Sequence, residues 1–238
     1  MSRERLDKYL ANANLGTRSR VKEYLKSGRV TVNSSIQKDG SVKIDTDCDK
    51  VCFDGNEVSY ETYRYYLLNK PAGCVSATKD KLSDTVLDIF KNEDTRNLFP
   101  VGRLDKDTEG LLLITNDGEL AHNLLSPKKH VDKTYLATLD RKLDEENRLK
   151  VENRIDIGDD TPCLPAKVEI LDENDVKITI CEGRYHQVKR MFEAVGYEVV
   201  YLKRISMGGL LLDNIPTGSY RKLSEEEVDK YLRNIKEN

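Results

Sequence analysis

The chain has few of the features that mark membrane, secreted or metal-binding proteins. None of its apolar runs approaches the roughly eighteen residues that a membrane-spanning helix needs. Residues 1–5 are charged and contain no apolar core, which argues against a secretory signal. These absences favour a cytoplasmic protein without a membrane partner.

Cysteine and histidine are also sparse. The five cysteines are odd in number, no two form a Cys-x-x-Cys pair, and the three histidines are scattered. A structural metal site needs more closely spaced ligands. The sequence also contains no Gly-x-x-x-x-Gly-Lys-Ser/Thr phosphate-binding loop. We therefore expect free, reduced cysteines and neither a metal nor a cofactor.

Acidic charge slightly exceeds basic charge over the whole chain of 238 residues, giving a net charge of −3. This balance argues against a uniformly basic nucleic-acid-binding protein, but the charges are unevenly distributed. Residues 1–30 hold eight Lys or Arg and three acids, whereas residues 140–175 hold twelve acids and six bases. The N-terminal segment is therefore a candidate site for a polyanion.

The first sixty residues have the pattern of a small αβ module. Apolar residues recur at helical spacing over residues 6–13, and Gly16 ends that helix. Thr17 can cap a second helix. Residues 30–33 and 50–53 predict two short strands separated by turn-rich sequence.

Basic side chains crowd the second of these helices. Between residues 18 and 29, five bases stand against the single acid Glu23, which exceeds what a solvated helix face needs. The segments at residues 5–10, 19–20 and 28–33 resemble the S4 RNA-binding domain over about residues 3–58. This resemblance implies that the helix pair contacts RNA phosphates, which provide affinity rather than base specificity. The residues implied are Arg5, Arg18, Arg20, Lys22 and Arg29.

The remainder of the chain, after a linker at residues 57–62, predicts a larger α+β domain. Strands and helices follow one another without the regular alternation of a doubly wound sheet. Strands are expected at 64–70, 111–114, 133–139, 166–171, 176–181 and 198–205, and helices at 85–90, 119–125, 145–152, 184–195 and 225–235. We expect a mixed, mainly antiparallel sheet with flanking helices, and domains at residues 1–58 and 62–238.

The segment 102–115 is the most informative part of the chain. Asp105, Asp107 and Glu109 lie on a glycine-flanked loop directly before four apolar residues that predict a strand buried on both faces. Such a strand can aim a carboxylate, although an acidic turn that merely solubilises a sheet edge fits the spacing equally well.

The same segment resembles the central motif of the RsuA-like pseudouridine synthases, which reads Gly-Arg-Leu-Asp-x-Asp-Thr-x-Gly-Leu-Leu. The resemblance implies that Asp105 is the catalytic nucleophile. It also implies that Arg103 fills the space left by the extruded nucleotide, since a guanidinium can stack on bases and reach phosphate. Lys70-Pro71-Ala72-Gly73 resembles the turn that opens the catalytic domain of this family.

Three further segments carry the resemblance. Tyr135 occupies the position of the tyrosine that stacks on the extruded base, although a strand tyrosine is more often an ordinary packed aromatic. Residues 182–191 resemble the motif whose basic side chain pairs with the nucleophile. Lys189 is the first choice for that partner and Arg184 the second. Leu202 resembles the apolar wall of the pocket, the weakest of these assignments.

The resemblance implies an enzyme that isomerises one uridine in ribosomal RNA without a cofactor, acting as a monomer. Small-subunit 16S RNA is favoured and large-subunit 23S RNA is the near alternative. Naked RNA and a partly assembled ribosomal subunit both remain open as substrate, as do the uridine itself and attack at C1′ or C6. Two other readings stay open: a non-catalytic ribosome-assembly factor, and a retaining glycosidase using two of the three loop carboxylates.

Overall fold

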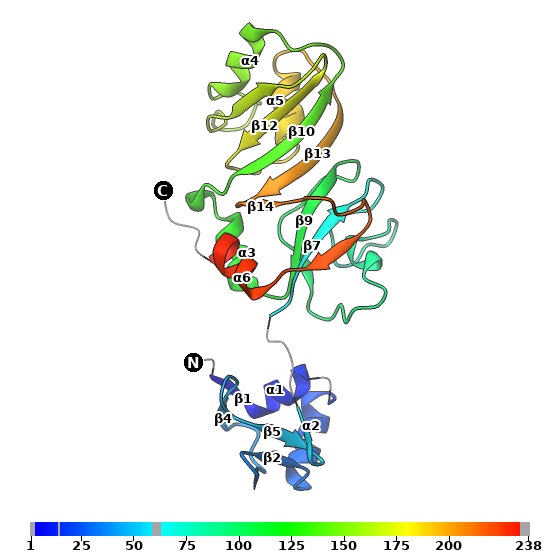
Figure 1. The fold of residues 1–238 in the computed structure, drawn as a ribbon, viewed down its shortest axis with the longest axis vertical. Coiled ribbons are helices and arrows are strands. Elements are labelled where there is room, and N and C mark those ends of the chain that lie inside the picture. Colours follow the sequence, from blue (N-terminus) through cyan, green and yellow to red (C-terminus); the bar gives the residue numbers. More distant parts are fainter. Residues whose placement is uncertain (1–2, 14, 59–62, 234–238) are drawn as a thin grey trace. The chain divides into compact units, whose positions relative to one another are not determined.

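The computed structural model describes residues 3–13, 15–58 and 63–233. The chain divides into two compact units, Met1–Thr62 and Tyr63–Asn238 (Figure 1). The expected linker, residues 57–62, ends at this division; Glu57 belongs to a short strand, and residues 59–62 lie outside the described part of the chain. The two units are described separately.

In its described residues, the first unit is a small αβ module with two helices and two antiparallel sheets. Leu6, Leu10, Val21 and Leu25 pack from the two helices into one core. The Thr17 hydroxyl accepts the Arg20 N–H at 3.4 Å, so the expected cap is present. One sheet pairs β1 with β4, and the other has the order β3-β2-β5-β6. The elements are β1 (Arg3–Arg5), α1 (Leu6–Asn12), α2 (Arg18–Lys26), β2 (Val30–Val32), β3 (Ser35–Ile36), β4 (Lys43–Asp45), β5 (Val51–Phe53) and β6 (Asn56–Glu57).

The second unit is built on one mixed sheet with the strand order β11-β12-β10-β13-β9-β7-β15, with β14 added to β13 and β8 to β9. All described strand pairs are antiparallel except β13 with β9. The predicted α+β class and mainly antiparallel sheet are therefore confirmed. The strands are β7 (Tyr65–Lys70), β8 (Phe99–Pro100), β9 (Glu109–Thr115), β10 (Lys133–Leu139), β11 (Lys167–Ile170), β12 (Asp175–Ile180), β13 (Val199–Met207), β14 (Leu210–Leu211) and β15 (Tyr220–Lys222).

Hydrophobic cores lie on both faces of this sheet. Successive residues of β9 alternate between them, with Leu111 and Leu113 in one core and Leu112 and Ile114 in the other. The predicted two-sided burial of this strand is confirmed. Figure 1 shows α4 and α5 beside the half of the sheet that holds β10, β12 and β13, and α3 and α6 beside the other half. The helices are η1 (Val86–Ile89), α3 (Gly118–Leu125), η2 (Pro127–Lys129), α4 (Glu145–Glu152), α5 (Gln187–Glu193), α6 (Glu225–Val228) and η3 (Asp229–Arg233).

Three expected helices differ from those observed. Within the expected helix 85–90, residues 86–89 form a short 3-10 helix, η1. Helix α5 begins at Gln187 rather than at residue 184, because His186 has a φ of 48°, which an α-helix cannot continue. The C-terminal helix changes from α-helical to π-helical geometry between α6 and η3, and residues 234–235 lie outside the described residues. None of the helices within the described ranges is long and apolar enough to cross a membrane.

A close backbone contact joins β9 to β13 immediately after the Asp105 loop. Gly110 pairs with Arg204 at the start of the parallel register. A Cβ atom at Gly110 would lie 2.2 Å from the Arg204 carbonyl oxygen, and the φ of 103° also requires glycine. Glycine thus lets the loop end directly against β13.

A buried lysine at the end of β7 holds the main chain of the same loop. The Lys70 side chain is fully buried, and its ammonium donates to the carbonyl oxygens of Asp105 at 3.0 Å and Thr108 at 2.9 Å. It also donates to the carbonyls of Pro71 at 3.0 Å and Lys106 at 3.3 Å. Burial lowers the pKa of Lys70, so these four oxygens offset a substantial desolvation cost.

We expect Lys70→Met to lower the free energy of unfolding by about 2–4 kcal/mol, because buried carbonyl oxygens would lose their donor. Urea denaturation measures this loss. Lys91→Met, at an exposed position, serves as the control and should change stability by less than about 0.5 kcal/mol. Equal stability of the Lys70 variant and the parent chain would contradict this account of the loop.

Candidate active site

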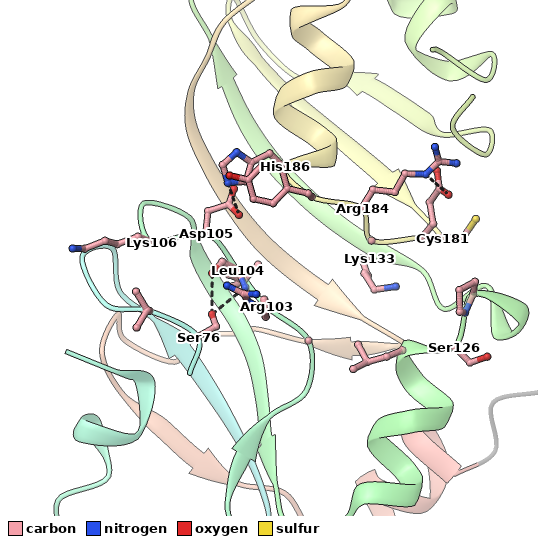
Figure 2. Close-up of a pocket in the computed structure, with 17 residues that line it drawn as sticks. Ser76, Arg103, Leu104, Asp105, Lys106, Ser126, Lys133, Cys181, Arg184 and His186 are labelled. Atoms are coloured by element: carbon pink, nitrogen blue, oxygen red, sulfur yellow. Dashed lines mark hydrogen bonds and ion pairs between the residues drawn. The ribbon is translucent and has the colours of Figure 1, made fainter. Parts of the chain in front are cut away.

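The loop before β9 presents Asp105 on a rigid main chain. Leu104 is buried, and its N–H donates to the Ser76 hydroxyl at 3.0 Å while that hydroxyl donates back to the Leu104 carbonyl at 2.9 Å. Figure 2 shows Ser76 next to Leu104, with Asp105 extending away from this anchor. Together with the Lys70 bond to the Asp105 carbonyl, these contacts fix the direction of the carboxylate.

Two basic side chains at the start of α5 lie within ion-pair distance of the Asp105 carboxylate. His186 Nε2 lies 3.4 Å from Asp105 Oδ1, and Lys189 Nζ lies 3.5 Å from Oδ2. The Asp105 side chain is 25% exposed, so it can reach a ligand but is largely removed from solvent. His186 has a left-handed conformation and is the residue immediately before α5.

Lys189 also binds a second carboxylate, and more closely. Its ammonium donates to both oxygens of Asp107, at 2.7 and 2.8 Å. This hydrogen bond holds the pKa of Asp107 below its usual value. The sequence predicted that Lys189 pairs with Asp105 alone. In the structure, Lys189 contacts both Asp105 and Asp107.

Arg184, the second candidate for the partner of Asp105, forms other contacts. Its guanidinium donates to Glu182 at 3.1 Å and to the carbonyl of Pro162 at 2.9 Å, and it lies 3.5 Å from Asp159. Figure 2 shows Arg184 on the opposite side of the site from Asp105. It therefore fastens the segment around Pro162 to the start of the α5 motif.

A small cavity of about 110 Å³ opens beside the carboxylate and continues into a groove of about 800 Å³. Tyr135 from β10 and Leu202 from β13 line the small cavity, and both are largely buried. Asp105 and Arg103 line both spaces, and Arg103 is exposed. The structure thus brings Arg103, Asp105, Tyr135 and Leu202 together around one pocket, with Lys189 next to the carboxylate.

Among the three carboxylates of the loop, Asp105 is the one that lines this pocket. The Asp107 side chain is 73% exposed and is engaged by Lys189. Glu109 accepts a hydrogen bond from the Tyr201 hydroxyl at 3.0 Å. A glycosidase that uses two of these groups is therefore disfavoured, because they do not face each other across a sugar-sized space.

Two pocket residues had no separate role in the sequence analysis. His186 was noted only within a basic motif, and its contact with Asp105 depends on a positive φ that spacing cannot reveal. Lys133 is 7% exposed and donates to the Val131 carbonyl at 2.8 Å. Burial, with the nearby positive charge of Arg204, lowers the pKa of Lys133 to about 8. In an alternating strand, position 133 lies on the same face as Tyr135, and this spacing is the signal that could have identified Lys133.

The five bases of the first unit that were expected to contact RNA divide into two groups. Arg5 pairs with Asp7, Arg20 with Glu23, and Arg29 with Asp54 within the unit. The side chains of Arg18 and Lys22 are exposed and form no salt bridge or hydrogen bond within the described residues. These two are therefore the expected bases whose charge is most available to a polyanion.

The described residues contain no group of three or more His, Cys, Asp and Glu side chains arranged to hold a metal ion. The five cysteines are free.

Family models cover both units of the chain. Residues 4–51 match the S4 domain, and residues 64–194 match the RNA pseudouridylate synthase family. The second match contains Asp105, Tyr135, Arg184 and Lys189.

Curated relatives resemble the chain over nearly its full length. An uncharacterized RNA pseudouridine synthase of Bacillus subtilis is 47% identical over 94% of this chain and 96% of its own. The ribosomal small subunit pseudouridine synthase A of Haemophilus influenzae is 41% identical over 96% of this chain and 100% of its own. The ribosomal large subunit pseudouridine synthase B of Bacillus subtilis is 41% identical over 95% of each chain.

A solved structure gives the same result. A crystal structure of a pseudouridylate synthase has a TM-score of 0.69 and 41% identity, covering 96% of this chain and 99% of that one. With the family match over more than half of the chain and relatives above 40% identity, the chain belongs to the RNA pseudouridylate synthase family.

Proposed function

We propose that this enzyme converts one uridine of small-subunit ribosomal RNA to pseudouridine, with Asp105 as the nucleophile. The observation that carries the proposal is the single loop carboxylate at the junction of a small cavity and a larger groove, flanked by two basic side chains. Such a cavity suits one extruded base, and the groove suits the RNA strand from which that base comes.

The proposed reaction is an isomerisation in which no atom is added from outside. Asp105 attacks the target nucleoside, and the bond between N1 of uracil and C1′ of ribose breaks. The uracil turns within the cavity, a bond forms between its C5 and C1′, and the bond to Asp105 breaks so that the free carboxylate returns. The C5 proton is lost to solvent and N1 gains a proton from solvent. Attack at C1′ and attack at C6 are both compatible with this outcome.

Separate side chains serve separate parts of this reaction in the proposal. Tyr135 stacks on the extruded base and Leu202 covers its other side, since a base removed from the helix must regain contacts. Lys189 places a positive charge 3.5 Å from one carboxylate oxygen of Asp105, and the His186 ring nitrogen lies 3.4 Å from the other, so both can hold the carboxylate in position. Arg103 at the rim occupies the space that the base vacates.

The ribosomal substrate is proposed from the relatives together with the basic first unit. Relatives named for the small subunit are 41% identical, and one named for the large subunit is equally similar, so 23S RNA is the second candidate. Residues 1–58 would bind RNA phosphates and residues 62–238 would perform the chemistry. We propose a monomer that acts in the cytoplasm, where ribosomal RNA is available either naked or in a partly assembled subunit.

Asp105→Asn should reduce the single-turnover rate of pseudouridine formation by more than about 1,000-fold, because an amide cannot act as the nucleophile. The matched variant Asp107→Asn should lose less than about fivefold, since it removes only an exposed ion pair. Tritium release from uracil C5 measures both rates, and thermal unfolding checks that both variants fold. Comparable losses in the two variants would argue against Asp105 as the sole nucleophile.

Deletion of the gene should remove one pseudouridine from 16S RNA and none from 23S RNA. Chemical mapping of pseudouridine in both ribosomal RNAs gives the result, and re-expression of the intact chain should restore the site while the Asp105→Asn variant should not. A site lost from 23S RNA alone would assign the enzyme to the large subunit. An unchanged map of both RNAs would argue for a non-catalytic assembly role.

The double variant Arg18→Ala/Lys22→Ala should weaken RNA binding and flatten its dependence on salt. Each lost phosphate contact lowers the slope of log K against log salt by about 0.7–0.9. Lys38→Ala, an exposed base outside the α1–α2 pair of the same unit, is the control. Filter binding over a range of salt concentrations provides the slopes, and an unaltered slope in the double variant would exclude these two bases as phosphate contacts.

A further inference from the structure

An exposed aromatic ring stands at the rim of the groove next to the nucleophile. Tyr185 is 76% exposed and lines the groove but not the small cavity. Single exposed aromatics are common on protein surfaces and need no function. This one differs because its ring stacks on His186, with 3.8 Å between ring centroids and an angle of 18° between ring planes.

His186 connects this ring pair to the chemistry. It lines both the small cavity and the groove, and its Nε2 atom lies 3.4 Å from Asp105 Oδ1. His186 covers one face of the Tyr185 ring, so the high exposure of Tyr185 leaves its other face open. Figure 2 shows His186 next to Asp105.

The main chain beneath the rings is held in place before any ligand arrives. The Tyr185 carbonyl accepts a hydrogen bond from Arg190 at 3.2 Å, and the Arg184 N–H donates to the Gln187 side chain at 2.9 Å. Arg190 is itself paired with Asp159 at 2.6 Å. An exposed ring on such a fixed turn loses little conformational freedom when a flat ligand stacks on it.

The remaining lining of the groove favours a nucleotide as that ligand. Exposed Arg103 and Lys106 line the same groove and can meet phosphates on either side of a stacked base. The groove is also several times larger than the cavity beside Asp105. It therefore has room for a second nucleotide outside the small cavity.

We infer that Tyr185 and His186 form a second base subsite, in which the open face of Tyr185 stacks on a nucleobase adjacent in the RNA to the extruded uridine. The inference rests on the proposed function, because it assumes that RNA occupies the groove. It adds a contact between the enzyme and a nucleotide next to the target. This contact depends on the position of a flat base and not on the hydrogen-bonding groups at the edge of that base. Such stacking tolerates any base but requires that one be present.

The test measures the dissociation constant of RNA and the single-turnover rate for the full chain and its variants. Tyr185→Leu should weaken binding roughly tenfold while leaving the rate at saturating RNA within about twofold, since stacking is worth this much per base. Tyr185→Phe keeps the ring and should bind as the parent does. Tyr201→Leu removes another partly exposed tyrosine, one that does not line the groove, and should also leave binding unchanged.

RNAs with an abasic residue at one flanking position at a time then identify the contact. At one position the abasic residue should weaken binding by the parent chain but cause no further loss in Tyr185→Leu. The inference is overturned if Tyr185→Leu binds RNA as tightly as the parent. It is also overturned if, on every abasic RNA, Tyr185→Leu still binds more weakly than the parent by the same factor as on intact RNA. These outcomes differ from failure of the proposed function, in which the parent chain binds RNA but forms no pseudouridine.

Discussion

The site depends on the hydrogen bonds that the buried ammonium of Lys70 donates. The ammonium donates hydrogen bonds to four carbonyl oxygens at the end of β7 and in the Asp105 loop. These bonds hold the main chain of a charged surface loop in place as a fixed platform. Without this centre, the loop would need other donors for its inward-facing carbonyls. The close contact of Gly110 with Arg204 then ties the same platform to β13, where Leu202 reaches the pocket.

The two aspartates on this platform differ in their exposure and in their contacts with basic side chains. Asp107 lies outermost and occupies most of the hydrogen-bonding capacity of Lys189, while Asp105 is deeper and shares Lys189 and His186 at longer distances. Lys133 and Arg204 add further positive charge at the buried end of the pocket. Asp105 therefore has basic neighbours without the short hydrogen bonds that would occupy both of its oxygens.

The elements that the sequence predicted well are those determined by local pattern. Strand 133–139 and helix 145–152 were predicted with their observed bounds, and the more buried positions of the strand alternate over its full length. The start of α5 was missed, because His186 has a positive φ that the spacing of apolar residues does not reveal. The motif resemblance brought Asp105, Tyr135 and Lys189 to one site. The sharing of Lys189 with Asp107 could not be predicted, since it depends on side-chain distances between segments 82 residues apart.

A structure of the enzyme with RNA that carries 5-fluorouridine at the target position tests the central claim most directly. The account predicts that the extruded nucleotide fills the small cavity against Tyr135, with an Asp105 oxygen in contact with the reacting carbon and the Lys70 hydrogen bonds intact. A nucleotide bound elsewhere, or one that reaches Asp107 instead of Asp105, would contradict it.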